Sequence, residues 1–230
     1  MPTHWYTADL HLGHEGILRL SRRPFASVGE MDAALIDNLW ACVQPDDVLW
    51  VVGDFAHGPK AKDVAWLERT FAKLPGAEKH LVVGNHDPEE TQMLPWTSVS
   101  RLALVDDPSS DPAARRPLVL CHDPMMTWEG ARKGALHLFG HVHDQWAGAR
   151  GAVNVGVDQW GYGPVRVEDV ARRAAKLAPH AHSRSGSCTA SVFRRWHSVE
   201  WSRTGQSRRA SRRRLATKPA SGAAAGRRDP

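Results

Sequence analysis

Short apolar runs alternate with amphipathic segments along the chain up to about residue 177. Five compact runs are typical of buried strands: residues 48–52, 81–83, 118–120, 136–139 and the alternating 152–157. Residues 4–7 are a weaker strand candidate. Apolar residues recur every three or four positions through residues 31–43 and 64–74, which predicts helices there, and a final helix is expected over residues 167–177. Strands alternating with helices indicate an α/β fold with a substantial parallel or mixed sheet.

The chain beyond residue 179 differs from the rest in charge. Residues 1–179 carry 18 Lys and Arg against 23 Asp and Glu, whereas residues 180–230 carry 12 against 2, so the overall charge of +5 reflects the end of the chain. Ser, Arg, Ala and Gly dominate there without apolar periodicity. We therefore predict a domain over residues 1–179 and a disordered basic tail over residues 180–230. Such a tail could bind nucleic acid, although a solvated, dispensable extension is the favoured interpretation.

Cysteine spacing and hydropathy indicate the cellular compartment in which the protein is expected. Cys42, Cys121 and Cys188 share no C-x-x-C spacing, which argues against a disulfide framework. The start of the chain lacks the basic and apolar regions of a signal peptide, and no stretch approaches the roughly 20 apolar residues that span a bilayer. We therefore expect a cytoplasmic protein without a membrane partner, and the oligomeric state stays open.

Five short polar motifs follow the predicted strands or lie inside them. In order they are Asp9-Leu10-His11, Gly53-Asp54, Gly84-Asn85-His86-Asp87, His122 and Gly140-His141-Val142-His143. Side chains two apart on a strand project to the same face, so Asp9 and His11 can converge on one cation. A glycine at a strand end allows a sharp turn and presents the next side chain at the sheet edge. Carboxylates, imidazoles and one amide from successive strand ends are what a two-metal hydrolytic site requires.

Each motif also has a plainer interpretation when taken alone. The D-x-H pattern is common, Asp54 could cap a turn or helix, and a lone histidine such as His122 is more often structural. Gly84-Asn85-His86-Asp87 is more specific, because a turn does not require His-Asp after the Asn. An H-x-H pair without nearby cysteines argues against a closed structural zinc site, and mixed oxygen and nitrogen ligands suit Mn, Fe, Zn or Co. The ordered set favours a metal site.

In this order the motifs resemble the signature of the calcineurin-like metallophosphoesterase superfamily, which runs D-x-H, G-D, G-N-H-D/E, H and G-H-x-H. The segments T-A-D-L-H-L-G-H at residues 7–14 and N-V-G-V-D at residues 154–158 further resemble its small bacterial single-domain branch. The likeness covers roughly residues 3–170 and none of the tail. It implies a sandwich of two mixed β-sheets flanked by helices, and a metal-dependent phosphoric ester hydrolase that acts on a small phosphorylated substrate.

The resemblance also implies a role for each motif residue. The ligands implied for one divalent cation are Asp9, His11, Asp54 and His143. Those implied for the other are Asp54, Asn85, His122 and His141, and manganese is favoured at both sites. Coordination lowers the pKa of water to about 7, so a hydroxide would form between the cations. This hydroxide would attack phosphorus directly. His86 would then protonate the leaving oxygen, and Asp87 would orient His86.

One motif departs from the family pattern. Many relatives continue G-D as G-D-x-x-D-R, with an arginine that can contact phosphate, whereas here F-A-H-G follows Asp54. His14 and His57 are candidates to supply the missing substrate contact, and ordinary loop histidines are an equal alternative. The adjacent Arg22 and Arg23 are expected to be solvated.

Three functional hypotheses follow from these observations. The first is a two-metal phosphoesterase that acts on a small phosphomonoester or phosphodiester. The second is a nuclease or nucleotide phosphodiesterase that holds nucleic acid with its basic tail. The third, a binding scaffold that kept the fold and lost the chemistry, is disfavoured because neither a ligand nor the proton donor is missing from the motifs.

Overall fold

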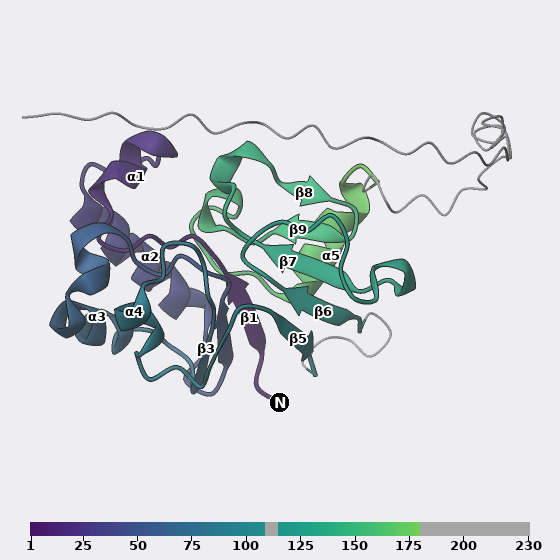
Figure 1. The fold of residues 1–230 in the computed structure, drawn as a ribbon, viewed down its shortest axis with the longest axis horizontal. Coiled ribbons are helices and arrows are strands. Elements are labelled where there is room, and N and C mark those ends of the chain that lie inside the picture. The colour runs from purple at the N-terminus through teal and green to yellow at the C-terminus, as the bar shows by residue number, and fades with distance from the viewer. Residues whose placement is uncertain (109–114, 180–230) are drawn as a thin grey trace, which may run out of the picture. The chain divides into compact units, whose positions relative to one another are not determined.

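A computed structural model describes residues 1–108 and 115–179 of the protein, all within the unit Met1–Ser185 (Figure 1). The predicted basic tail lies outside the described residues. The helices are α1 (Glu15–Leu20), α2 (Val28–Cys42), α3 (Val64–Phe71), α4 (Glu89–Gln92) and α5 (Val167–Lys176). The predicted helices over residues 31–43, 64–74 and 167–177 are therefore confirmed as α2, α3 and α5.

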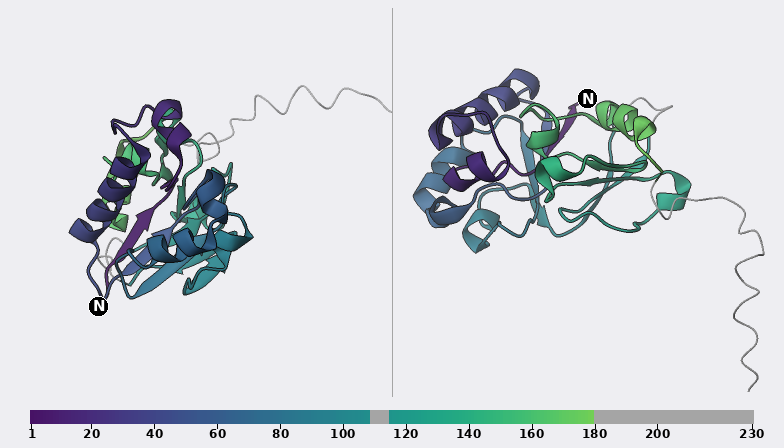
Figure 2. Two further views of the ribbon diagram at one scale, coloured as in Figure 1. Left: turned by 90° about the vertical axis from the view of Figure 1, so that its left-hand side faces the viewer. Right: turned by 90° about the horizontal axis from the view of Figure 1, so that it is seen from above.

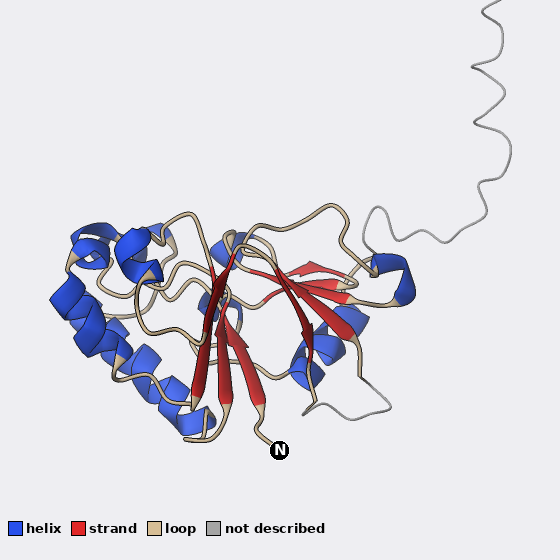
Figure 3. Cartoon of the chain, turned by 60° about the horizontal axis from the view of Figure 1, so that its bottom comes forward, coloured by secondary structure: helices blue, strands red, loops and turns tan. Residues whose placement is uncertain are grey.

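Two sheets form the centre of the fold (Figure 3). The first has the order β1 (His4–Thr7), β2 (Val48–Val51), β3 (Glu78–Val82) and β4 (Ser98–Ser100). The second has the order β5 (Ala103–Asp106), β6 (Pro117–Leu120), β7 (Leu136–Phe139), β9 (Ala152–Asn154) and β8 (Gly148–Ala149). The expected α/β architecture of two sheets flanked by helices is confirmed. The second sheet is mixed, with antiparallel strands at both edges, but the first is wholly parallel.

The first sheet is buried on both faces because it separates two cores. Leu49 and Val51 of β2 belong to the core that contains the apolar faces of α2 and α3. The alternate residues Val48 and Trp50 belong to the second core, with residues of β6, β7 and α5. Figure 2 shows the first helices along the outer side of this sheet. Burial on both faces explains why residues 48–52 form a continuous apolar run instead of an alternating one.

Two helices of the first core begin at side-chain caps. The Ser27 hydroxyl accepts a hydrogen bond from the Glu30 amide at the start of α2, and the Asp63 carboxylate accepts one from the Trp66 amide at the start of α3. Such caps satisfy amides that have no partner within the helix, and each contributes about 1 kcal/mol. The caps help to explain why the apolar periodicity of these segments was sufficient to predict both helices.

Several short elements were not predicted from the sequence. They are α1, α4, β4, β5 and β8, and β4 carries the small polar residues Ser98 and Ser100 around an exposed Val99. The predicted strand over residues 152–157 ends earlier, at Asn154. Beyond it, Gly156 pairs with Ala8 and the Val157 amide donates to the Ala8 carbonyl at 3.0 Å. This pairing brings the end of β9 beside the end of β1, where the first polar motif begins.

Among the described residues, no helix is both long enough and apolar enough to cross a membrane.

Candidate metal centre

The seven predicted ligands come from loops after the carboxyl ends of five strands. In chain order they are Asp9 and His11 after β1, Asp54 after β2, Asn85 after β3, His122 after β6, and His141 and His143 after β7. Within each sheet these strands run parallel, so their carboxyl ends lie on the same side. Parallel α/β sheets present their functional side chains at this edge. The topology therefore accounts for the convergence of residues that are up to 134 positions apart in the chain.

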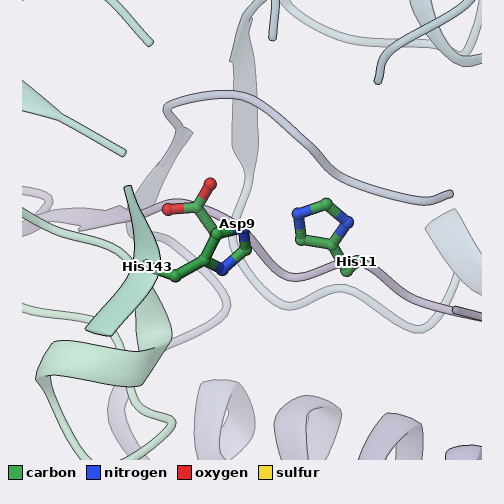
Figure 4. A group of neighbouring side chains, drawn as sticks. All are labelled: Asp9, His11 and His143. Carbon is green, nitrogen blue, oxygen red and sulfur yellow. The ribbon is translucent and has the colours of Figure 1, made fainter. Parts of the chain in front are cut away.

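One group of ligands is buried. Donor atoms of Asp9, His11 and His143 all lie within 4.8 Å of one another, and Figure 4 shows the three side chains together. Asp9 and His11 are almost fully inaccessible to solvent. We call these three residues the buried end of the centre.

Asp54 and His122 connect the buried end to two more exposed ligands. Asp54 Oδ2 lies 3.3 Å from His11 Nε2 and 3.3 Å from His122 Nε2. Asn85 Oδ1 lies 3.2 Å from His122 Nε2 and 2.9 Å from His141 Nδ1. Asn85 and His141 are exposed, and we call them the open end. Ligand atoms bound to one ion are separated by roughly 3 Å, so the spacing fits cations.

Backbone strain is concentrated on the predicted ligands. Seven non-glycine residues among those described have a positive φ, and five of them are Asp9, His11, Asp54, His141 and His143. Left-handed backbone costs such residues about 1–3 kcal/mol each and persists where the surrounding structure imposes it. In these loops the surrounding structure therefore fixes the direction of the side chains at the expense of the preferred backbone conformation.

The glycines of the second and third motifs allow close approach of the ligand side chains. Gly53 has φ +87°, and a β-carbon there would overlap Nδ1 of His122. A β-carbon on Gly84 would overlap Oδ1 of Asp54. The glycine of each motif therefore leaves room for the ligand of another motif, and Gly53 also adopts the left-handed backbone of its own turn.

Outer hydrogen bonds orient two of the histidine ligands. His122 Nδ1 lies 2.9 Å from the Val52 carbonyl oxygen, and His143 Nδ1 lies 2.9 Å from Asp158 Oδ2. In each ring the Nδ1–H donates to oxygen, which leaves the Nε2 lone pair for a cation.

A buried arginine supports the buried end. Arg23 is 3% exposed and donates from Nε and Nη2 to the two oxygens of Asp158 at 2.8 and 2.9 Å. It also donates to the carbonyl oxygens of Asp9 at 2.7 Å and Leu10 at 3.0 Å. Arg23 thus holds the first motif and the partner of His143 in one network.

The expectation that Arg22 and Arg23 are both solvated is wrong for Arg23, whereas Arg22 is exposed. No local pattern distinguishes the two arginines. The burial of Arg23 depends on Asp158, which lies 135 positions away in the chain.

The buried donor atoms fit a cation. Nδ1 of His11 is buried and makes no hydrogen bond with a described residue, and the buried Nε2 has the Asp54 carboxylate at 3.3 Å beside it. A buried ring nitrogen without a hydrogen bond is costly, whereas coordination would satisfy the lone pair of the imidazole. The chemistry of the donor set, two carboxylates with imidazoles and one amide, is that of a site for divalent transition metals.

The electrostatics of Asp9, His11 and Asp54 favour the same interpretation. Burial raises the pKa of Asp9 to about 6 and lowers the pKa of His11 to about 4. Burial also acts to raise the pKa of Asp54, but hydrogen bonds and charge from His11 and His122 outweigh it and lower the pKa. At neutral pH both carboxylates are therefore ionised and His11 is neutral, which are the forms that bind a cation.

Asp87 contacts the backbone of the site. Its oxygens accept hydrogen bonds from the amides of Asp54, Phe55 and Gly84 at 2.8–2.9 Å. A hydrogen bond to the His86 ring, the contact predicted from the sequence, is not found among the described residues. Asp87 instead ties the loop after β2 to the loop after β3.

The remaining predicted site residues lie beside the ligands. The His57 ring centroid is 4.1 Å from that of His14 and 4.0 Å from that of His86, and all three rings lie within 6 Å of His11. The structure thus brings His14, His57 and His86 together next to the centre. Their roles in substrate binding and proton transfer stay predictions.

A pocket of about 520 Å³ opens on this histidine group. Its lining includes Asn85 and His86 after β3, together with His57 and the 3₁₀ helix η1 (Gly58–Lys62). The sequence did not indicate Lys62 as a site residue.

Comparisons with known proteins agree with this geometry. Residues 4–109 match the profile of the calcineurin-like phosphoesterase family. The chain is 26% identical to the Gene 66 protein of Mycobacterium phage L5 over 190 residues, which cover 70% of this chain and 89% of the phage protein. It is 28% identical to the Gene 66 protein of Mycobacterium phage D29 over 184 residues, covering 68% and 88%.

A solved structure shares the fold. The protein of unknown function AQ665 from Aquifex aeolicus superimposes with a TM-score of 0.57 at 21% identity, over 75% of this chain and 100% of that chain. The family match covers β1 to β5 and the first three motifs, and the fold places the last two motifs beside them. Over residues 4–109 the chain is thus similar to the calcineurin-like phosphoesterases, a family of metal-dependent phosphoester hydrolases.

Proposed function

We propose that this protein hydrolyses a phosphomonoester or phosphodiester by direct attack of water on phosphorus, without a phosphorylated enzyme intermediate. The observation that supports it best is the spacing of the seven predicted ligands, which joins Asp54 to both His11 and His122 at 3.3 Å. When bound, two divalent cations, with manganese favoured, supply an activated water and neutralise charge on the phosphoryl oxygens.

The chain's own residues divide the remaining work. Asp54 lies between the two ends of the centre, and Asn85 adds a ligand without adding negative charge. His86 lies beside His11 and lines the pocket, where its imidazole can donate a proton to the leaving oxygen. Asp87 holds the loops that carry Asp54 and Asn85 in place.

His57 and His14 are proposed to contact the substrate in place of the family's missing arginine. His57 lines the pocket next to His86, and the His14 ring packs against His57. A ring N–H donated to a phosphoryl oxygen would supply part of the binding energy that an arginine supplies elsewhere.

Turnover of a panel of model monoesters and diesters tests the proposal, with protein reconstituted separately with Mn, Fe, Zn or Co. We expect hydrolysis that chelation abolishes, and loss of activity in Asp54→Asn and His86→Ala. Hydrolysis of a P-chiral phosphorothioate ester in isotope-labelled water should invert the configuration at phosphorus, because direct attack is a single displacement. Retention of configuration, or full activity in both variants, would exclude the mechanism.

The nuclease hypothesis depends on the 12 Lys and Arg of residues 180–230, which lie outside the described residues. Deleting this segment separates the two proposals. Unchanged turnover of oligonucleotides at low and moderate salt would remove the tail from the mechanism, because phosphate contacts made by lysine and arginine are strongly salt-dependent.

A further inference from the structure

The pocket beside the open end is lined by residues of two segments. Asn85 and His86 come from the loop after β3, and Gly58 and Lys62 come from η1. Pro59, Ala61 and Pro88 add apolar residues to the lining. A cavity of about 520 Å³ falls within the size range of small-molecule sites. It therefore has room for more of a substrate than its phosphate.

The pocket lining offers positive charge to a ligand and little negative charge. Lys62 is the cation of the lining, and Asp87 is its carboxylate. Asp87 is 5% exposed and its oxygens already accept three backbone amides, so little of its charge is offered to a ligand. The pocket therefore favours an anionic group over a neutral or cationic one.

Lys62 differs from its neighbour Lys60 in its partners. Lys60 Nζ lies 3.9 Å from Asp63 Oδ2 and 5.7 Å from the centre of the Trp66 ring, and Lys60 does not line the pocket. For Lys62, no ion pair is found with a described residue. Asp63, the nearest acidic residue in the chain, is engaged by Lys60 and by the Trp66 amide. Lys62 is thus the lysine of η1 that is available to a ligand.

We propose that this pocket binds the leaving group of the substrate and that Lys62 pairs with a second anionic group on it. The substrate class is then a phosphate ester whose leaving group carries a further carboxylate or phosphate. This inference rests on the proposed function, because His86 identifies the leaving-group side. A proton donor must lie next to the oxygen that departs, and His86 and Lys62 line the same pocket.

Two phosphonates that differ in one charge test the proposal without turnover. Para-carboxybenzylphosphonate and para-carbamoylbenzylphosphonate have nearly the same shape, and neither can be hydrolysed. Calorimetric titration of the full-length, manganese-reconstituted protein measures both affinities. We expect the carboxylate ligand to bind about three- to fivefold more tightly, which is the range of a solvent-accessible ion pair, and the preference to shrink at high salt.

Two lysine variants identify the residue responsible. Lys62→Gln should bind the two phosphonates equally, whereas the matched control Lys60→Gln should keep the wild-type preference. Equal binding by the wild type, no binding of the carboxylate ligand, or a preference that survives in Lys62→Gln would overturn the proposal. Turnover of para-nitrophenyl phosphate by the wild type is measured in parallel, so that failure of the proposed function is seen separately.

A third ligand distinguishes the two kinds of anion. Replacing the carboxylate with a second phosphonate group mimics a leaving group that carries phosphate. A larger loss of affinity in Lys62→Gln for the diphosphonate than for the carboxylate would assign the pocket to a phosphate-bearing leaving group. The reverse order would assign it to a carboxylate-bearing one.

Discussion

The two ends of the candidate metal centre differ in their surroundings more than in their predicted ligands. At the buried end, His143 is paired with Asp158, whose carboxylate is held by the 3%-exposed Arg23. At the open end, His141 has Asp123 at 3.9 Å, but the side chains of these two residues are 41% and 71% exposed. A histidine and aspartate pair is thus built into the interior at one end and lies in solvent at the other.

This difference indicates a division of work. A buried network fixes ring orientation and resists screening, so the buried end should govern how tightly the centre holds a cation. The open end borders the pocket and His86, so it should govern what is bound and how fast it reacts. Four predictions test this division, and each would weaken it if the two ends responded alike.

The largest effect is expected from His86→Ala, in the pocket that borders the open end. Loss of a general acid should lower kcat by roughly 10²- to 10⁴-fold for an alkyl phosphate, whose leaving oxygen needs a proton. The loss should be much smaller for para-nitrophenyl phosphate, which leaves readily without one. Steady-state kinetics on both esters measure this, with metal affinity followed by calorimetry. A fall in metal affinity equal to the fall in kcat would place His86 with the ligands instead.

Asp9→Asn should change stability in opposite directions with and without metal. Burial raises the pKa of Asp9 from 3.8 to about 6. Above pH 6 the folded state therefore contains an ionised carboxylate that burial destabilises. In chelator at pH 7 we expect the variant to be more stable than the wild type by about 1–3 kcal/mol.

The size of this effect depends on pH, and its sign depends on the metal. The free-energy penalty of the ionised Asp9 is complete above pH 6 and absent below pH 3.8, so the advantage of Asp9→Asn should vanish at acid pH. With saturating manganese the variant should instead be the less stable protein, because it has lost an ionised ligand. Chemical denaturation at the two pH values, with and without metal, measures both. A stability difference independent of pH would contradict the argument.

Asp158→Asn should weaken metal binding by about 10- to 100-fold, because the partner of a histidine ligand would lose its charge. The matched variant at the open end, Asp123→Asn, should change metal affinity little, since exposed pairs contribute about 0–1 kcal/mol. Calorimetric titration with manganese compares them. At saturating metal, Asp158→Asn should recover most of its kcat. Equal effects of the two substitutions would show that burial does not separate the ends.

The smallest effect is expected from His57→Ala, which removes one proposed hydrogen bond to the substrate. We expect KM to rise about two- to tenfold with little change in metal affinity. His80→Ala is the control, because its ring stacks on Trp50 and bonds Ser98 within the first sheet. That variant should lose stability but keep KM. A similar rise in KM for both would remove His57 from the substrate site.

The local pattern of apolar residues was sufficient to predict an element that buries a regular face. Continuous apolar residues predicted β2, and apolar spacing of three and four predicted α2. It was insufficient for β4, whose residues are mostly exposed, and for β8, which has only two residues and forms because β9 is beside it. Such elements exist through pairing with a distant segment, and pairing leaves little trace in the residues themselves.

The same contrast holds at the metal centre. Glycines and polar residues at strand ends are local signals, and they were enough to nominate seven ligands, His86 and the histidines His14 and His57. The direction of each side chain is set by contacts with other loops. Asp87 illustrates this: next to His86 in the chain, its carboxylate is directed to the backbone of Asp54 and Phe55.

The order of apolar runs and polar motifs along this chain was therefore enough to establish its α/β class and to nominate the ligands of its metal centre. Tertiary contacts established which end of the centre is buried, why Arg23 is not at the surface, and why Lys62 of η1 shares a pocket with His86. The physical reason is the distance along the chain over which each effect acts. Backbone propensity and burial periodicity act over a few residues, whereas ion pairing and pocket shape bring together residues that are far apart in the chain, 24 positions for Lys62 and His86 and 135 for Arg23 and Asp158.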